Sequence, residues 1–178
     1  MKNKKELNII KRDGRKELLD ISKVHKMTEA ACEGLNGVSS SEVEMNSGLQ
    51  FSDGMTTNEI QEILIKSAND LISLEAPNYQ YVAARLLLFS LQKHVFGKFV
   101  NPDAHAPLRF VVASNVERGV YDKSILDKYT DDEWNKLDSY IKHDRDLDFT
   151  YAGLRQIVDK YLVQDRSSGK IYETPQYM

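Results

Sequence analysis

Two short alternating runs open the sequence, on either side of Asp13-Gly14. Residues 7–12 and 15–19 each read as a short strand, and the period of two puts Ile9 and Lys11 on the same face. Asp-Gly accepts the positive φ angles that both central positions of a type I′ turn require. The pattern therefore predicts a tight β-hairpin.

Apolar residues then recur at helical spacing. A first helix is expected over residues 23–35, with Asp20 or Ser22 able to cap its start. Ser39-Ser40-Ser41-Glu42 is a capping signature, so it predicts a second helix over residues 39–51.

The most regular stretch begins at Thr56, which forms the pattern of a capping box with Glu59. The helix that follows has a wide apolar stripe, made of Ile60, Ile63, Leu64, Ser67, Ala68, Leu71 and Ile72. Pro77 separates this helix from a fourth one, which Gly97 ends. Two strands cannot bury an apolar side alone, so the hairpin should lie as a lid on the helices.

Asn101-Pro102 and Ala106-Pro107 interrupt the pattern, and we place a domain boundary there, giving domains of residues 1–100 and 101–178. The second domain should be helical, with a short β-hairpin around the loop 165–169 and the start of a helix at Thr174-Pro175. The expected fold class is α+β and mainly helical: a four-helix bundle covered by a small β-hairpin or sheet, then a second helical segment.

Composition narrows the function classes. Of 178 residues, 41% are hydrophobic and 29% are charged, which is an ordinary globular balance. The net charge of −3 gives no indication of a nucleic-acid surface, and no apolar run approaches the roughly 18 residues of a membrane span. A charged start without an apolar segment does not resemble a secretory signal, and the single cysteine, Cys32, excludes an internal disulfide. We expect a cytoplasmic protein.

Cations gather around the predicted hairpin. Lys11, Arg12, Arg15 and Lys16 lie beside the turn, and Lys23 opens the next helix. This arrangement suits an anionic ligand such as a polyphosphate. The alternative is a solvated hairpin whose charges protect its edges, and spacing alone favours that alternative because lysines near turns are common.

Other candidate sites are weaker. Asp144, Asp146 and Asp148 imitate the opening of a calcium loop, but Phe149 stands where the loop needs Gly and Arg155 where it needs Glu. Pairing of these carboxylates with nearby arginines is the better interpretation. No phosphate-binding glycine loop and no metal-ligand spacing of histidines is present, so no metal site is expected.

Several runs carry a family resemblance. Lys11-Arg12-Asp13-Gly14, Lys23-Val24-His25, Ala30-Ala31-Cys32-Glu33-Gly34 and Asp53-Gly54-Met55-Thr56-Thr57-Asn58-Glu59-Ile60 resemble the ATP-cone. The sequence is similar to the N-terminal part of the large subunit of class I ribonucleotide reductase in Pro77-Asn78-Tyr79-Gln80-Tyr81-Val82-Ala83-Ala84-Arg85, His143-Asp144-Arg145-Asp146, Lys160-Tyr161-Leu162-Val163 and Ile171-Tyr172-Glu173-Thr174-Pro175-Gln176. The resemblance spans nearly the whole chain.

The resemblance implies a four-helix bundle under a small sheet that binds ATP as activator and dATP as inhibitor, with Mg²⁺. It implies an effector site in which cations hold the triphosphate, carboxylates lie near the adenine, Ile9 packs on the base and Thr57 contacts the sugar–phosphate part. The implied cations are Lys11, Arg12, Lys23 and Lys93, and the implied carboxylates are Glu17 and Asp20. The chemistry is compatible, because lysine and arginine bind phosphate and a carboxylate accepts from the adenine amino group.

Two positions depart from the family. Gln61 stands where many dATP-sensitive members have His, and Asp20 where Asn is frequent. Gln cannot gain a proton near phosphate as His can. Asp20 adds negative charge to a polyanion site unless it faces the base or caps the helix. Nucleotide binding stays the expectation, and whether dATP inhibits is left open.

The family reduces ribonucleotides with a cysteine radical and a cysteine pair, and Cys32 matches none of these, so no catalytic residue and no catalytic cofactor is expected in this chain. We expect the regulatory part of a reductase, inactive alone, whose partners are the remainder of the large subunit, in cis or as a separate chain, and a radical-generating small subunit. The alternatives are a free-standing ATP-cone that senses nucleotides and a helical interaction module without a ligand. Residues after Pro107 favour the reductase.

Overall fold

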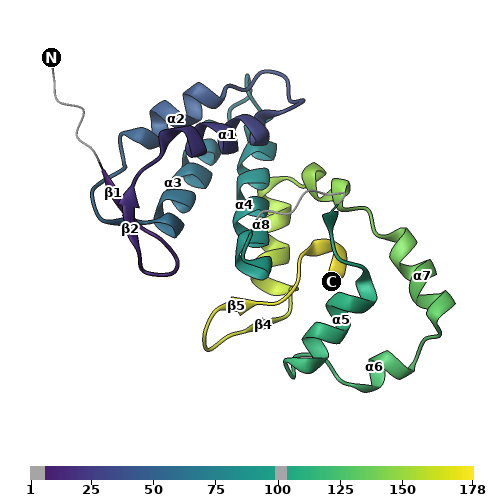
Figure 1. The fold of residues 1–178 in the computed structure, drawn as a ribbon. Helices are drawn as coiled ribbons and strands as arrows, with labels where there is room; N and C mark the ends of the chain where they lie inside the picture. Colours follow the sequence, from purple (N-terminus) through teal and green to yellow (C-terminus); the bar gives the residue numbers. More distant parts are fainter. Residues whose placement is uncertain (1–6, 99–103) are drawn as a thin grey trace, which may run out of the picture. The chain divides into compact units, whose positions relative to one another are not determined.

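A computed structural model describes residues 7–98 and 104–178. The chain divides into two compact units, residues 1–90 with 149–155 and residues 91–148 with 156–178, and each is described by itself. The break expected at Asn101-Pro102, with the boundary between residues 100 and 101, lies outside the described residues. The fold class is confirmed: the described residues are mainly helical, with a small mixed sheet and a second hairpin (Figure 1).

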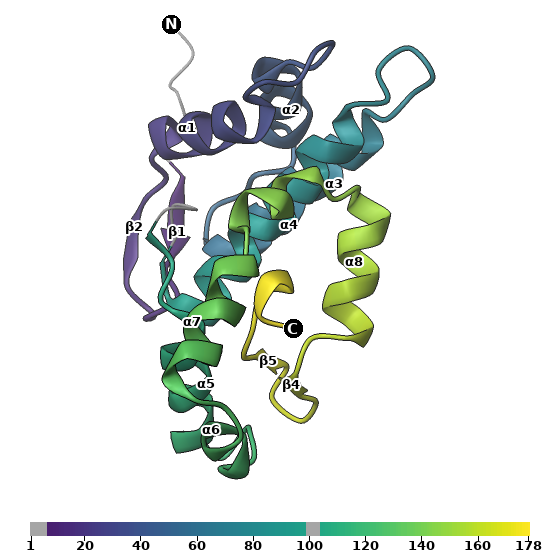
Figure 2. The same ribbon diagram turned by 90° about the vertical axis from the view of Figure 1, so that its right-hand side faces the viewer.

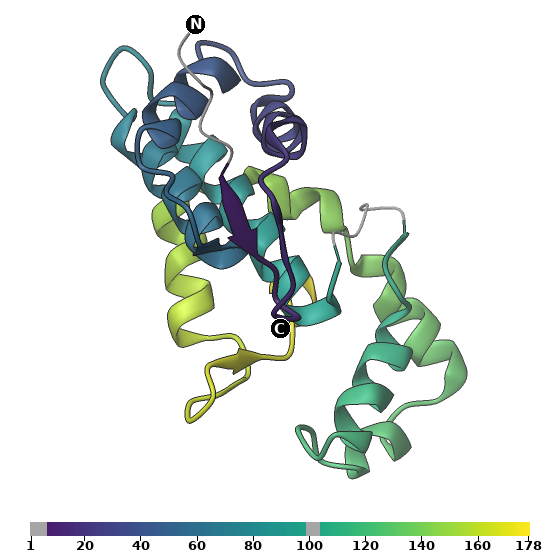
Figure 3. The same ribbon diagram turned by 60° about the vertical axis from the view of Figure 1, so that its left-hand side comes forward.

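The sheet of the first unit has three strands. β1 (Asn8–Ile10) lies between β2 (Lys16–Leu18) and β3 (Met55–Thr56), antiparallel to the former and parallel to the latter. The hairpin was predicted, although its strands are shorter than expected, and β3 was not. Because β3 runs directly into helix α3, its pairing with β1 brings the hairpin to the start of that helix (Figure 3).

Four helices follow the hairpin, as predicted. They are α1 (Ile21–Cys32), α2 (Ser40–Gly48), α3 (Thr57–Asp70) and α4 (Tyr79–Phe96). α1 packs on α2 and α2 on α3. The hydrophobic effect drives this packing, because side chains from all four helices and from the sheet are buried, among them Ile9, Val24, Val43, Leu64 and Leu86.

The two predicted capping signatures of this unit had different outcomes. At α3 both hydrogen bonds of the box form between Thr56 and Glu59. At α2 the box was wrong: Ser39 stands at the N-cap but its side chain makes no capping bond. Instead the Tyr79 hydroxyl accepts from the Ser39 amide at 2.9 Å and bonds the Glu42 carboxylate. A buried tyrosine from α4 therefore takes the place that local capping would fill.

α4 is also fastened to the C-terminal end of α1. The Arg85 guanidinium donates to the backbone carbonyls of Ala31 at 3.3 Å and Glu33 at 2.6 Å. These carbonyls lie at the end of a helix, where the last C=O groups have no partner within the helix. A cation placed there also opposes the negative end of the helix dipole.

The second unit contains α5 (Leu108–Glu117), α6 (Ser124–Asp127) and α7 (Asp131–Tyr140), followed by the short 3₁₀ helix η2 (His143–Asp148). α8 (Tyr151–Lys160) begins in residues of the first unit and leads to β4 (Gln164–Asp165), β5 (Lys170–Ile171) and η3 (Pro175–Tyr177). α5 contacts both α6 and α7 (Figure 2), and η2 contacts η3. A capping box forms between Thr130 and Glu133 at the start of α7, and the hairpin predicted around residues 165–169 is confirmed.

Buried carboxylates hold the second unit together. Glu173 is 3% exposed, accepts from the Val163 amide at 2.8 Å and bonds the Tyr121 hydroxyl. Asp146, which the sequence suggested would pair with an arginine, is 2% exposed and accepts from Gln176 Nε2 at 3.1 Å. Burial raises the pKa of Asp146 to about 6. None of the helices in the described ranges combines the length and apolar character needed to cross a membrane.

Candidate effector site

The turn of the hairpin differs from the predicted type I′ turn. The Gly14 amide donates to the Lys11 carbonyl at 2.9 Å, and the Lys11 amide donates to the Arg15 carbonyl at 2.8 Å. The loop between Lys11 and Arg15 therefore has three residues, 12–14. Gly14 has φ +84°, whereas Asp13 keeps a negative φ. A type I turn followed by a left-handed glycine has this pattern. Asp13 is held by Arg15, whose amide and Nε both donate to its carboxylate.

The register of the sheet decides which charges face the helices. Ile9 lies directly opposite Glu17, and directly opposed residues project from the same face of a sheet. Lys11, two residues beyond Ile9, continues that face. Ile9 is 5% exposed, so this is the face turned toward the interior. Lys16 lies opposite Ile10 and belongs to the outer face.

Two lysines meet at one carboxylate on this inner face. Glu17 Oε1 lies 3.0 Å from Lys11 Nζ and 4.0 Å from Lys23 Nζ, which comes from the first turn of α1. The Lys11 and Glu17 side chains are 30% and 35% exposed, and Lys23 is 67% exposed. Ion pairs this exposed are worth little by themselves. They can therefore be exchanged for a bound anion at small cost.

Arg12 connects the hairpin to the start of α3. Its Nε donates to Asn58 Oδ1 at 3.1 Å. A guanidinium has five N–H donors, so the contact with Asn58 uses only part of its capacity. Thr57, the first residue of α3, precedes Asn58, and the cap at Thr56 fixes this turn. The structure thus brings Arg12 and Thr57 to the same helix end.

Two predicted site residues have roles in the fold. Asp20 is the N-cap of α1: its Oδ1 accepts from the Ser22 amide at 3.0 Å and from the Ser22 hydroxyl at 2.6 Å. These hydrogen bonds lower its pKa, and Lys23 Nζ lies 3.8 Å from its other oxygen. Gln61 is 5% exposed and donates to the Leu86 carbonyl at 3.0 Å, which joins α3 to α4.

Lys93 completes the predicted set, and Cys32 was not part of it. Lys93 lies half-buried in the last turn of α4, among residues of the second unit, so its distance from the hairpin stays a prediction. Cys32 ends α1, and burial raises the pKa of its thiol to about 11. Such a thiol carries almost no thiolate at neutral pH and is a poor nucleophile.

Sequence reasoning missed Asn58 and β3. Asn58 was visible as a polar residue in the first turn of a capped helix, but nothing local indicated that it would bind Arg12. Met55 and Thr56 form a strand only because Ile9 and Ile10 lie beside them. A two-residue strand has no periodicity that a sequence pattern could reveal.

In the comparison with protein families, residues 7–94 match the ATP cone domain. The matched range contains the sheet, α1, α2, α3 and nearly all of α4. It also contains every predicted site residue.

The similarity to known proteins extends beyond the cone. The chain is 48% identical over 172 residues to ribonucleoside-diphosphate reductase 1 subunit alpha of Salmonella typhimurium and 45% identical over 172 residues to the protein of that name from Escherichia coli, matches that cover 97% of this chain. It is 44% identical over 173 residues, 96% of the chain, to ribonucleoside-diphosphate reductase subunit alpha of Enterobacteria phage T4. In each case the chain spans 22% of the relative.

Proposed function

Because this chain is homologous to the N-terminal region of class I ribonucleoside-diphosphate reductase large subunits, with an ATP-cone match over residues 7–94, we propose that it binds ATP or dATP as an allosteric effector on the inner face of the β1–β2 hairpin. One observation carries the proposal. Glu17 Oε1 occupies the position between the ammonium groups of Lys11 and Lys23. A phosphate oxygen fits that position and is stabilised by the same two charges.

In this proposal, different residues contact different parts of the nucleotide. Lys11, Lys23 and the remaining donors of Arg12 bind the triphosphate, and Glu17, released from the lysines, accepts from the adenine amino group. Ile9 supplies the apolar edge for the base and Thr57 contacts the sugar–phosphate part. Lys93 is a further phosphate ligand. The triphosphate carries Mg²⁺ on its own oxygens, which are the hard ligands that this ion prefers.

Asp20 and Gln61 are supporting residues in this proposal. The Asp20 carboxylate is engaged by Ser22, and so it adds less repulsion toward phosphate than an unbonded carboxylate would. Gln61 stays neutral at all pH values, and its amide is committed to Leu86. Both ATP and dATP are expected to bind, since the contacts invoked here do not require the 2′-hydroxyl.

The wider role proposed is regulation of ribonucleotide reduction in the cytoplasm, which supplies deoxyribonucleotides for DNA synthesis. Residues 1–100 are the cone and residues 101–178 begin the catalytic domain. The remainder of the large subunit and a radical-generating small subunit are the proposed partners. A free-standing nucleotide sensor is the second candidate, but the similarity continues through residues beyond 94, which a lone cone would not need.

Calorimetric titration of the chain with ATP and dATP tests the proposal. Lys11→Met should weaken ATP binding by about tenfold, because a charge-assisted contact is lost. Lys16→Met is the matched control: this lysine is on the adjacent strand but on the outer face, and its loss should leave affinity unchanged. Lys23→Met and Lys26→Met form a second pair on α1. Equal affinities within both pairs would reject the inner-face site.

The proposed role in ribonucleotide reduction needs a separate assay. The chain should show no reductase turnover alone or with the small subunit, because the chemistry requires cysteines other than Cys32. Turnover should appear only with a polypeptide that contains the rest of the large subunit, and ATP should then change its rate. Turnover by this chain with the small subunit alone would contradict the proposal.

A further inference from the structure

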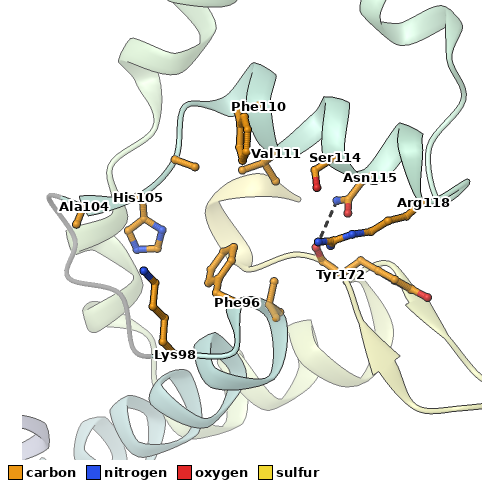
Figure 4. Close-up of a pocket in the computed structure, with 12 residues that line it drawn as sticks. Phe96, Lys98, Ala104, His105, Phe110, Val111, Ser114, Asn115, Arg118 and Tyr172 are labelled. Carbon is orange, nitrogen blue, oxygen red and sulfur yellow. Dashed lines mark hydrogen bonds between the residues drawn. The ribbon is translucent and has the colours of Figure 1, made fainter.

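The second unit contains a cavity of about 360 Å³, a volume in the range of small-molecule sites (Figure 4). Its walls come from the end of α4, the segment before α5, one face of α5 and Tyr172, which follows β5. The lining residues on α5 are Phe110, Val111, Ser114 and Asn115, and Arg118 lines the cavity from the C-cap position of this helix. Their spacing of three and four residues places them on one helix face, so the wall is a continuous stripe.

Aromatic rings provide the apolar surface of this cavity. Phe96 lies in its centre in Figure 4, with Phe110 on the opposite wall and Tyr172 at one end. Phe110 is 66% exposed, which leaves its ring available to a ligand. Flat apolar walls of this kind favour a planar ligand.

The charges that line the cavity are all positive. Lys98 lies at one end and Arg118 at the other, and no aspartate or glutamate is among the lining residues, although acidic residues outnumber basic ones 27 to 24 in the chain. Within the described parts of the chain, neither Lys98 nor Arg118 takes part in an ion pair. Uncompensated cations in a cleft attract anions.

His105 adds hydrogen-bonding groups without partners. Both of its ring nitrogens are buried and lack a hydrogen-bond partner among the residues that the structure describes. The ring stacks on His143 at 3.5 Å between centroids and meets Phe96 edge-on at 5.8 Å. Burial lowers its pKa, so the ring is neutral at pH 7 and offers one donor and one acceptor. Buried polar atoms of this kind are normally satisfied, so a ligand is a natural partner.

We propose that this cavity binds a small planar anion, a phosphate or carboxylate carried on an aromatic ring. The anionic group lies against Arg118 and the Ser114 hydroxyl, the ring lies against Phe96 and Phe110, and Lys98 meets an acceptor at the far end. The carbonyls at the C-terminal end of α5 would oppose an anion. They are engaged, however: Ser114 accepts from the Arg118 amide at 3.2 Å and Asn115 accepts from Val120 at 2.8 Å.

Phenyl phosphate is the probe, titrated into the 178-residue chain by calorimetry and followed in the amide NMR spectrum. We expect saturable binding with shifts at Ser114, Asn115 and Arg118. Arg118→Met should weaken it about tenfold, since a charge-assisted bond is lost. Phe110→Ala should weaken binding of phenyl phosphate but leave binding of inorganic phosphate unchanged. Because the ring is exposed, the substitution removes little packing and the variant should fold. Arg166→Met, in the β4–β5 loop, is the control for charge.

Several results would overturn the proposal. These are a lack of saturation, an affinity that Arg118→Met leaves unchanged, and equal affinity for phenyl phosphate and inorganic phosphate. A further one is loss of binding in a longer polypeptide that continues beyond Met178, because another segment of the protein would then fill the cavity. ATP titration of Arg118→Met should match the unaltered chain, so failure here is distinct from failure of the effector site.

Discussion

The two candidate sites, the inner face of the hairpin and the cavity of the second unit, treat their cations in opposite ways. On the inner face of the hairpin, Lys11 and Lys23 meet Glu17, and on α1 His25 lies 3.0 Å from Glu44 and 3.1 Å from Glu29. In the cavity of the second unit, the described lining residues include no carboxylate beside Lys98 and Arg118. The carboxylates buried in that unit bond instead to neutral groups of the fold, as Glu173 does with Tyr121.

The difference indicates two modes of anion binding. A site whose cations are already paired must exchange an internal carboxylate for the ligand, so its affinity is moderate and the exchanged carboxylate can take a new role. A site with uncompensated cations gains the full attraction but has no internal group to release. The first mode suits a sensor that changes state, because bound and free forms differ in their internal contacts.

The largest expected effect comes from breaking the pairing itself. Glu17→Gln removes the charge that holds Lys11 and Lys23 and should strengthen binding of inorganic tripolyphosphate by about tenfold. The affinity for ATP should rise less than the affinity for tripolyphosphate, because Gln accepts more weakly from the adenine amino group than a carboxylate does. Calorimetry with both ligands measures the difference.

Asp13→Asn is the control for this substitution, since Asp13 pairs with Arg15 at the tip of the turn rather than with the lysines. Its affinity for tripolyphosphate should stay near that of the unaltered chain. An equal gain in both variants would mean that net charge, and not exchange at Glu17, sets the affinity.

A second comparison uses the two capping boxes. Thr56→Val and Thr130→Val each remove the side-chain acceptor at the start of a helix, at α3 and α7, and each should lower the free energy of unfolding of its own unit by about 1 kcal/mol. Only Thr56→Val should weaken ATP binding, because its helix end presents Asn58 to Arg12. Amide hydrogen exchange locates the stability loss. Equal ATP affinities in the two variants would argue against a role for this helix end.

The smallest expected effect is in the pH dependence of the second unit. Burial beside His105 lowers the pKa of His143 to about 4, so between about pH 6.5 and 4 the unfolded chain binds a proton that the folded chain does not, and acid lowers the free energy of unfolding. Burial raises the pKa of Asp146 to about 6, so the folded carboxyl binds its proton first and acid raises that free energy between about pH 6 and 3.8. The two contributions oppose each other.

Variants with one substitution each should separate the contributions of His143 and Asp146 to the free energy of unfolding. In His143→Phe, which keeps a ring against His105, acidification from pH 6 to 4 should stabilise the unit. In Asp146→Asn, which keeps an acceptor for Gln176, the same change should destabilise it. Denaturant unfolding followed by fluorescence of Trp134, the single tryptophan, reports on this unit. Parallel pH profiles in the two variants would contradict the assignment.

Local signals predicted much of the fold. The boxes at Thr56 and Thr130 form because both partners lie within one turn of helix, and no distant group competes. The capping box predicted at Ser39 does not form, because the hydroxyl of Tyr79, forty residues away, bonds both the Ser39 amide and the Glu42 carboxylate. The predicted type I′ turn was wrong because the loop has three residues, and only Gly14 among them takes a positive φ.

The predictable part of the site is the part that follows from the alternation of side chains along a strand, which has a period of two residues. That period put Ile9 and Lys11 on one face, and the register adds Glu17. The position of Gln61 was not predictable in the same way, because its burial depends on the Leu86 carbonyl, 25 residues away on another helix. Residues whose partners are distant in sequence need the fold before their role can be read.

The short strand β3 has a mechanical consequence. β1 is bonded to β3, and β3 passes into α3 at Thr57 with no loop between them. A ligand that pulls on Lys11 would therefore transmit force along the backbone of β1 to the first turn of α3, and no slack segment would absorb the displacement. A displacement of the hairpin would therefore reach the start of α3 directly.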